Sequence, residues 1–523
     1  MPAEPMSGRV AALMQRAQAH AVARDFDAAT EDYRSALALS PGDPDILLQL
    51  SYMASLAGCY RSAHGYALQA SQHDTQRVDV VKELLARLRT FNEIPAMLAS
   101  IERMLPMSRI PIPSLITIAA QLTYAGLPQR AIMFLDEARR ADPDYPPTLL
   151  SRAHVLMFLG RFDEAAKDAS LALARAPQIA QGYWLLSQVR KQGAGEAHLA
   201  RIRAQLKAPQ RTAQDRALLA FALHKELDDL GRREEAWHAL QEGCASKRSS
   251  LHYDAARMAA LFERLLRFAP RVSPVRTRPD SPAVPVFIVG MHRSGTTLIE
   301  QLLDGHSDVC GLGELYDFTS AMRYGTDHHC AGVIDPEIVE RASSVDFDMI
   351  GRRYLEGIAW RLSGERHFTD KLPSNFLNAG FICEALPQAK ILHMVRDPME
   401  TCFSNLRELF SDANPYSYDQ LELADFYQHY RTLMTHWHAR YPGRILDVDY
   451  AQLTRDPEKV IREVCGFIDI AFEPQMLGMQ SRTRGIVTAS AVQVRNGIHV
   501  EETPKWRAYE QYLVPLRERL GSG

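Results

Sequence analysis

The sequence lacks the features that would place it in a specialised class of protein. Its seven cysteines are scattered without a Cys-x-x-Cys pair, which predicts free thiols in a reducing compartment and no disulfide framework. No apolar run is long enough to span a bilayer, and the amino terminus has no basic-then-apolar signal pattern. With a net charge of −3, the composition favours neither nucleic acid nor an anionic membrane as a partner. These absences predict a soluble, cytoplasmic protein.

What the first half of the chain does contain is a regular repeat. Small or apolar residues recur at offsets of 12, 4 and 3, with a proline five residues later, and the starts Ala17, Ala119 and Ala153 differ by multiples of 34. This pattern resembles the tetratricopeptide repeat, in which small residues let two antiparallel helices approach closely. The matching positions are Ala17, Ala29, Tyr33, Ala36 and Pro41, then Ala119, Ala131, Leu135, Ala138 and Pro143, and then Ala153, Ala165, Ala169, Ala172 and Pro177. The unit near residue 78 is degenerate, with Leu85 and Met97 at the small positions.

A change of pattern divides the chain, whose 523 residues are too many for one ordinary domain. We expect tetratricopeptide-repeat helices with capping helices over residues 1–268 and a proline-rich linker over 269–283. From 284 to 523, short apolar runs alternate with helical segments, which predicts an α/β domain with a parallel sheet. The expected strands cover 284–290, 366–370, 389–395 and 444–449.

The first of these strands leads into a phosphate-binding motif. The spacing Gly290-x-x-x-x-Gly295-Thr296-Thr297 is typical of a loop whose backbone N–H groups and helix N-terminus hold an anion. Thr296 occupies the position where a nucleotide triphosphatase has its lysine, which argues against ATP, GTP and a nucleotide kinase. A nucleotide with one 5′-phosphate that carries another group fits better.

A second phosphate site is indicated after the third strand. Arg396 ends this strand, where its guanidinium could bind a phosphate through two hydrogen bonds, and Ser404 follows about two turns into the next helix. Together they indicate a second phosphate away from the 5′ end. The alternative is a salt bridge between Arg396 and Asp397 that only closes a strand–helix corner.

Five short motifs, in this order, resemble the sulfotransferases that use 3′-phosphoadenosine 5′-phosphosulfate (PAPS). More narrowly, the chain is similar to the tyrosylprotein sulfotransferase group and its bacterial relatives with attached tetratricopeptide repeats. The resemblance covers roughly residues 284–507 and implies a PAPS-binding α/β fold related to nucleotide kinases. The motifs are Arg293-Ser-Gly-Thr-Thr-Leu298, Gly313-Glu314, Asp370-Lys371-Leu-Pro, Val395-Arg396-Asp397 with Ser404, and Ser490-x-x-Gln493-Val494 followed by Lys505-Trp506.

The resemblance implies a role for each of these residues. The loop residues His292, Arg293, Ser294, Gly295, Thr296 and Thr297 would hold the 5′-phosphosulfate, with Arg293 reaching the sulfonate. Lys371 would stabilise the leaving oxygen, and Ser490 and Lys505 would contact the same phosphosulfate. Arg396 and Ser404 would bind the 3′-phosphate. No metal is implied, because no His or Cys cluster has the spacing of metal ligands.

Glu314 matches the family's catalytic glutamate and is the expected general base. It would remove the proton of the acceptor hydroxyl as this oxygen attacks sulfur in line. The alternative is a structural role, in which Glu314 helps to cap a helix N-terminus. His292 and His306 are competing bases, because other sulfotransferases use histidine.

Four later residues have roles that the sequence leaves open. Arg495 and Arg507 flank the last motif, where they would bind nucleotide phosphate or cover the surface of the site. Trp506 would stack on the adenine or anchor the fold. Tyr450 ends the fourth strand, where packing is more common than contact with the nucleotide.

The expected product is adenosine 3′,5′-bisphosphate, and the expected acceptor is a protein or peptide tyrosine docked by the repeats. One departure argues against an acidic peptide as the acceptor. The tyrosylprotein enzymes carry arginines here that engage acidic residues around the acceptor tyrosine, whereas this chain has Leu315-Tyr316-Asp317-Phe318, an acidic and aromatic run. The alternatives are a glycan, a lipid-linked or small hydroxylated acceptor, or a repeat adaptor whose α/β domain binds nucleotide without turnover.

Overall fold

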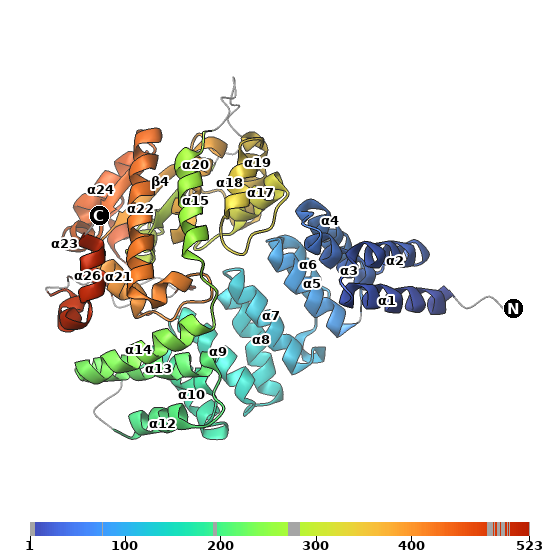
Figure 1. Cartoon of the computed structure of the whole chain (residues 1–523), viewed down its shortest axis with the longest axis horizontal. Helices are drawn as coiled ribbons and strands as arrows, with labels where there is room; N and C mark the ends of the chain where they lie inside the picture. The colour runs from blue at the N-terminus through green and yellow to red at the C-terminus, as the bar shows by residue number, and fades with distance from the viewer. Residues whose placement is uncertain are drawn as a thin grey trace.

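The computed structural model describes residues 6–75, 77–191, 196–269, 283–478 and 503–521, together with positions 485, 487, 488, 492, 497, 498 and 500. The chain has two parts, and Figure 1 shows the helical hairpins as a curved row beside an α/β body. This arrangement confirms the predicted fold class, an all-α repeat region followed by a parallel-sheet domain.

The repeat region consists of antiparallel helix pairs whose contacts are mostly between neighbours. Its helices are α1 (Met6–Val22), α2 (Phe26–Leu39), α3 (Pro44–Leu56), α4 (Tyr60–Ser71), α5 (Val78–Thr90), α6 (Ile94–Glu102), α7 (Ile112–Tyr124), α8 (Pro128–Ala141), α9 (Pro146–Phe158), α10 (Phe162–Arg175), α11 (Ala180–Val189), α12 (Glu196–Lys207), α13 (Ala213–Asp229) and α14 (Arg233–Ser249). The small residues of the repeat pattern lie between the paired helices, where Ala17, Ala29, Ala153 and Ala165 are fully buried. Leu85 and Met97 fill the same positions in the degenerate unit and are also buried.

The second part is built on a five-stranded parallel sheet in the order β2-β3-β1-β4-β5. Each predicted strand is present, and each begins and ends within one residue of its expected limits. The short edge strand β2 was not predicted. The strands are β1 (Val284–Gly290), β2 (Val309–Gly311), β3 (His367–Asp370), β4 (Lys390–Val395) and β5 (Ile445–Asp449).

Alternate residues of β1 face opposite sides of the sheet, as the two-residue period of a strand requires. Val286 and Ile288 belong to the cluster formed with α16 (Thr296–Leu303) and α24 (Pro457–Phe467). Phe287 faces the other side, where it packs on Phe318 of α17 (Asp317–Thr326) and Tyr354 of α19 (Phe347–Ile358). Helices therefore cover both faces, which leaves the carboxyl ends of the strands as the place for a site.

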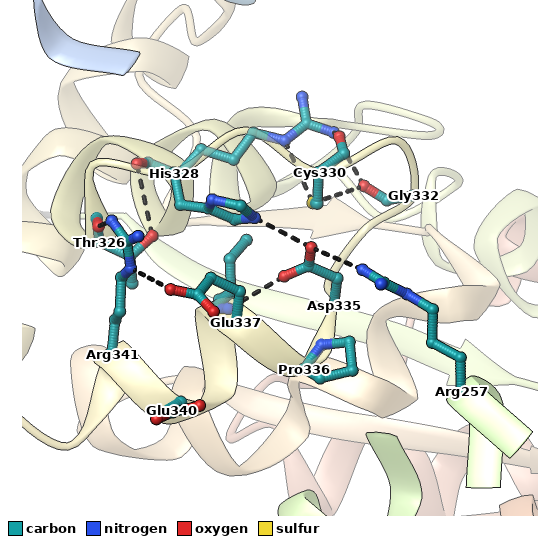
Figure 2. Close-up of polar contacts among 12 residues, drawn as sticks. Arg257, Thr326, His328, Cys330, Gly332, Asp335, Pro336, Glu337, Glu340 and Arg341 are labelled. Atoms are coloured by element: carbon teal, nitrogen blue, oxygen red, sulfur yellow. Dashed lines mark hydrogen bonds and ion pairs between the residues drawn. The ribbon is translucent and has the colours of Figure 1, made fainter. Parts of the chain in front are cut away.

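Helix α15 (Ala255–Arg267), which the sequence assigns to the cap of the repeats, packs against α18 (Pro336–Ala342) and α22 (Gln420–Arg440) of the α/β part. Phe262 lies against Phe426 of α22, with ring centroids 5.5 Å apart. Figure 2 shows Arg257 of α15 reaching Asp335, the residue that also accepts a hydrogen bond from His328 and caps α18. Most of the expected linker, residues 270–282, lies outside the described residues.

The repeats meet the α/β part first at α4 and the α5–α6 turn, which contact α17 and α19. Arg61 donates from its backbone N–H to Asp327 and from its guanidinium to the carbonyls of Tyr324 and Gly325. Ser320 of α17 donates to the carbonyl of Phe91 at 2.8 Å. We call this region the α4–α17 contact.

A second contact joins α13 and α14 to α21 (Pro398–Leu406) and to the 3-10 segments η4 (Pro415–Tyr418) and η6 (Lys505–Tyr512). Trp237 of α14 stacks on Tyr512 at 5.0 Å between ring centroids. Lys247 pairs with Asp412 at 2.7 Å. This α14–η6 contact and the α4–α17 contact both hold the repeat region to the α/β part.

Candidate functional site

The turn between β1 and α16 needs glycine at both ends. Gly290 has a φ of +150°, and a Cβ there would lie 2.8 Å from the carbonyl oxygen of Met394. Gly295 has a φ of +106°, and a Cβ there would overlap the ring of Tyr450. Any other residue would need a strained backbone and would displace a neighbour. The two glycines of the phosphate-binding motif therefore form a closely packed loop at the carboxyl end of β1.

The N-terminus of α16 offers hydrogen-bond donors for an anion. The first N–H groups of any helix have no partner within that helix, and the adjoining dipole favours negative charge. The side chains of Ser294, Thr296 and Thr297 are buried around it, and the Ser294 hydroxyl has no hydrogen-bond partner among the described residues. Arg293 holds a left-handed φ of +68° in the same loop, a conformation that is costly for a residue with a side chain.

Glu314 and Lys371 form an ion pair next to this loop. Lys371 follows β3 and is fully buried, and its Nζ donates to Glu314 Oε1 at 2.6 Å. Glu314 keeps 31 % of its side chain exposed, and no described residue donates to its second carboxylate oxygen. The Gly313 N–H donates to Glu300 of α16 at 2.7 Å, which ties the loop carrying Glu314 to the helix of the phosphate loop. The structure thus brings the expected base and the expected cation together.

Asp370, which precedes Lys371 in its motif, is a buried acid to which the sequence analysis gave no role. Tyr354 donates to Asp370 Oδ2 at 3.1 Å, and burial raises the pKa of this carboxyl well above its ordinary value. It therefore binds protons more readily than a surface aspartate and fixes the end of β3 next to Lys371.

The Arg293 side chain contacts Ser404, one of the residues expected to bind the 3′-phosphate. Its Nε donates to Ser404 Oγ at 3.2 Å, and its Nη1 lies 3.5 Å from Glu408 Oε2. Burial lowers the pKa of Arg293; Glu408 offsets part of this effect, while Arg396 and Arg407 add to it. Arg293, Ser404 and Arg396 therefore form one cationic group.

Arg396 contacts the backbone of the same loop. Its Nη1 donates to the backbone oxygen of Arg293 at 3.1 Å, and its guanidinium lies 4.5 Å above the ring of Tyr450. Its acidic partner is Glu400, at 2.8 Å, while Asp397 caps α21 by accepting from the Glu400 N–H. The ion pair at this corner is thus made with Glu400, one turn into the helix. Tyr450 packs between Arg396 and Gly295.

The two histidines considered as bases lie in different places. His292 lies in the loop with its ring nitrogens 3.4 Å from Ser374 Oγ and 3.5 Å from Tyr416 OH. Burial, and then Lys371 and Arg293, lower the pKa of His292 to about 4, so its ring is neutral at pH 7. His306 lies just before β2, at the amino edge of the sheet. Its ring nitrogen bonds to the carbonyl of Ala471. His306 is therefore remote from the phosphate loop and is not a candidate base.

The last motif is only partly visible. Ser490 and Arg495 lie outside the described residues, as does Gln493. Thr488, just before them, has its Oγ1 3.5 Å from that of Thr297 at the start of α16. Lys505 begins η6, and Trp506 is buried in the main apolar cluster with the Arg507 guanidinium 4.1 Å from its ring. Of the two roles left open for Trp506, burial in this cluster favours the structural anchor.

Two further supporting residues had no signal strong enough to identify them from sequence. Glu300 accepts from Gly313 and from Thr369, and Asn405 donates to the His292 carbonyl at 2.7 Å. Glu300 is the one charged residue of α16, which is the cue that could have indicated an inward-facing polar role.

Only one group of side chains in the described part of the chain could offer three ligand atoms to a metal. His393 of β4 and His438 of α22 each lie 2.7 Å from Oδ1 of Asp447 on β5, on the face of the sheet covered by α22. His393 also contacts the hydroxyl of Tyr430. No helix among the described residues has the length and apolar character needed to cross a membrane.

Comparison with known proteins agrees with this division. Residues 285–474 match the model of the sulfotransferase family, and residues 10–53 match a model of the tetratricopeptide repeat. An uncharacterized protein of Aquifex aeolicus is 30 % identical over 74 % of this chain and 52 % of its own length. The chain thus spans about half the length of that relative. A putative protein-tyrosine sulfotransferase of Caenorhabditis briggsae is 28 % identical over 42 % of this chain and 80 % of its own.

Solved structures of both kinds are found as well. The sulfotransferase domain of the curacin biosynthetic pathway is 19 % identical and covers 45 % of this chain and 98 % of its own, with a TM-score of 0.27. A tetratricopeptide repeat protein from Parabacteroides merdae is 14 % identical and covers 47 % of this chain and 94 % of its own, with a TM-score of 0.35. By the two family models, the protein joins a region with tetratricopeptide repeats to a part, residues 285–474, that matches the sulfotransferase family.

Proposed function

We propose that this protein is a PAPS-dependent sulfotransferase that moves a sulfuryl group to a hydroxyl of a protein or peptide tyrosine. The observation that carries the proposal is the position of the lysine. The phosphate loop has Thr296 where a triphosphatase has lysine, and the buried cation comes from the end of the neighbouring strand as Lys371, paired with Glu314. This arrangement supports a carboxylate acting as a base and a cation acting on the leaving group, next to a helix end that would bind an anion.

The residues around the loop fit a donor with phosphates at two places. Gly290 and Gly295 let the backbone approach closely, and the Ser294 hydroxyl is buried with no partner among the described residues. Arg293, Ser404 and Arg396 form the second group, which would hold the 3′-phosphate. PAPS would supply an activated sulfuryl group, and adenosine 3′,5′-bisphosphate would leave. Ser490, Arg495 and Lys505 remain proposed contacts of the same donor.

Each charged residue then has a task that its position supports. Glu314 would take the acceptor proton with its exposed carboxylate oxygen while its other oxygen stays bonded to Lys371. Lys371 would offset the charge that develops on the leaving oxygen, and because it is buried its effect is not weakened by water. His292 is neutral near pH 7 and would line the phosphate loop as a hydrogen-bonding side chain, without acting as the base.

The acceptor class rests on relatives and on the repeats. Distant relatives are named protein-tyrosine sulfotransferases, and tetratricopeptide repeats commonly bind protein partners. A cytoplasmic location is part of the same proposal.

The test has two steps. Calorimetry should show that adenosine 3′,5′-bisphosphate binds at least tenfold more tightly than ATP. Radiolabelled PAPS should then transfer its label to a tyrosine peptide. Lys371→Met should abolish transfer, whereas Lys390→Met, a matched lysine at the start of β4, should not. Equal binding of ATP and the bisphosphate would refute the donor assignment.

A further inference from the structure

Glu314, the base of the proposed function, has one carboxylate oxygen bonded to Lys371 and keeps 31 % of its side chain exposed. Its Oε1 faces the buried Lys371, so an acceptor has to approach from the other direction. The loop that carries Glu314 continues into Tyr316, whose ring stacks on Tyr124, the last residue of α7. The ring centroids are 5.5 Å apart and the planes differ by 13°. A repeat helix therefore borders the approach to the base.

The stack continues one layer further into the repeats. The guanidinium of Arg89, in the last turn of α5, lies 4.9 Å from the centroid of the Tyr124 ring. Tyr124 is 44 % exposed although it is a large aromatic residue inside an interface. Trp360, which neighbours the Arg361 that donates to the Ala125 carbonyl, is 37 % exposed. Exposed aromatic edges next to a reactive carboxylate are suited to bind a ring.

Arg89 differs from the other arginines along this interface. No described residue accepts a hydrogen bond from its guanidinium or places a carboxylate within ion-pair distance of it. In contrast, Arg353 pairs with Glu93, Arg61 bonds to two carbonyls, and Arg87 of the same helix bonds to Ser51. The ring of Tyr124 holds the Arg89 guanidinium in place, and its N–H donors can serve an incoming anion.

We propose that the acceptor binds in a site shared by the two parts of the chain, with Arg89 and Tyr124 of the repeats as its specificity-determining residues. The proposal rests on the proposed function and deepens it. The acceptor ring lies at the exposed edges of Tyr316 and Tyr124 with its hydroxyl at Glu314. Arg89, two stacking layers away, binds a carboxylate on the same acceptor chain. That distance corresponds to roughly three extended residues.

Two positions near the last motif, Gly485 and Thr488, support an acceptor that reaches from the repeats to the phosphate loop. Gly485 lies against Pro128 and Leu159 of the repeats, and Thr488 reaches Thr297 at the phosphate loop. Three residues span at most about 11 Å, so the repeats and the phosphate loop are no further apart here than a short peptide can bridge.

The test uses two tyrosine peptides with the full-length protein and radiolabelled PAPS. One peptide carries glutamates two to four residues on either side of the tyrosine, the other carries glutamines, and p-cresol serves as a phenol without a chain. The wild type should prefer the glutamate peptide by about tenfold in kcat/KM, the scale of one charge-assisted hydrogen bond. Arg89→Gln should reduce this preference to below twofold through KM while leaving turnover of p-cresol unchanged. Arg216→Gln, a half-buried arginine on α13, should keep the preference.

A second pair of variants separates acceptor binding from folding. Tyr124→Ala should raise KM for both peptides several-fold, Tyr124→Phe should restore it, and Tyr145→Ala, another exposed aromatic residue of the repeats, should have no effect. A wild type that uses both peptides equally, or an Arg89→Gln variant that keeps the preference, would overturn the shared site and leave the sulfotransferase assignment intact. A wild type that binds the bisphosphate but modifies none of the three acceptors would overturn the tyrosine acceptor itself.

Discussion

Arg152 in the repeats and Arg293 in the phosphate loop are both buried arginines, but their surroundings are opposite. Arg152 lies between two acids, with its Nη1 2.6 Å from Asp168 and its Nε 2.7 Å from Asp136. Burial alone would lower the pKa of Arg152, but these hydrogen bonds outweigh burial and raise it. At Arg293, burial and the neighbouring Arg396 and Arg407 lower the pKa despite Glu408. Arg152 is surrounded by acids, whereas Arg293 has two other arginines as well as Glu408 around it.

The largest expected effect tests whether the charges of the site serve chemistry. Glu314→Gln keeps the shape and the bond to Lys371 but cannot accept a proton. Turnover should fall by roughly 10²–10⁴-fold, with the affinity for adenosine 3′,5′-bisphosphate nearly unchanged. Steady-state kinetics together with calorimetry measure both quantities. A variant that keeps more than about a tenth of normal turnover would end the assignment of Glu314 as the base and direct attention to His292.

Arg152→Met should show the opposite pattern. It leaves the fully buried Asp168 without its closest cation, so the free energy of unfolding should drop by about 3–5 kcal/mol. Arg293→Met should cost at most about 1 kcal/mol, because Glu408, whose pKa burial raises, can take up a proton. Urea denaturation of both variants measures the difference. Equal losses of stability would contradict the comparison between the two arginines.

Arg396→Ala addresses the second phosphate. If Arg396 binds the 3′-phosphate, the affinity for the bisphosphate should fall by about 2–3 kcal/mol, the scale of a lost charge-assisted partner. The affinity for 5′-AMP, which lacks that phosphate, should hardly change. Calorimetry that finds the same loss for both nucleotides would assign Arg396 to the stability of the corner with Glu400 instead.

The last comparison concerns how the stability of the protein depends on pH through two buried histidines. Burial lowers the pKa of His154 in the repeats to about 4, and it does the same for His292 in the loop. Both values lie below that of the unfolded chain, so each histidine contributes stability that is complete above about pH 6.5 and is lost as the pH falls toward 4. Replacing either with asparagine should flatten the pH dependence of unfolding by up to about 3 kcal/mol in this window, since each pKa unit corresponds to about 1.4 kcal/mol. The bisphosphate should diminish the effect at His292 and leave that at His154 unchanged.

The sequence predicted what depends on local periodicity. The alanines of the repeats, the four longer strands and the two glycines of the phosphate loop lie where their spacing indicates. The edge strand Val309–Gly311 escaped prediction because three residues carry no readable alternation. The ion pair of Lys371 with Glu314 joins two motifs that were each identified, but only the fold brings their side chains to within 2.6 Å.

Contacts between distant segments could not be predicted in the same way. Nothing in the residues around Tyr124 indicates that its ring meets Tyr316, because the stack depends on how the repeat region docks. Helix α15 carries an apolar stripe of Leu261, Phe262 and Leu265 that would suit either part of the chain, and only the structure shows it on α22. The contact between Arg293 and Ser404 could not be predicted either, because the two residues belong to different motifs that only the fold brings together.

The α14–η6 contact has a consequence for the order of events during synthesis. Asp228 and Tyr509, which are bonded in the finished protein, lie 281 residues apart. At about 5–20 residues per second, the ribosome needs roughly 15–60 s to make the second after the first. During that interval the face of α14 that carries Trp237 is complete but has no Tyr512 to cover it. The growing chain therefore exposes an aromatic surface until its final residues emerge, and shortening its carboxyl end would make that exposure permanent.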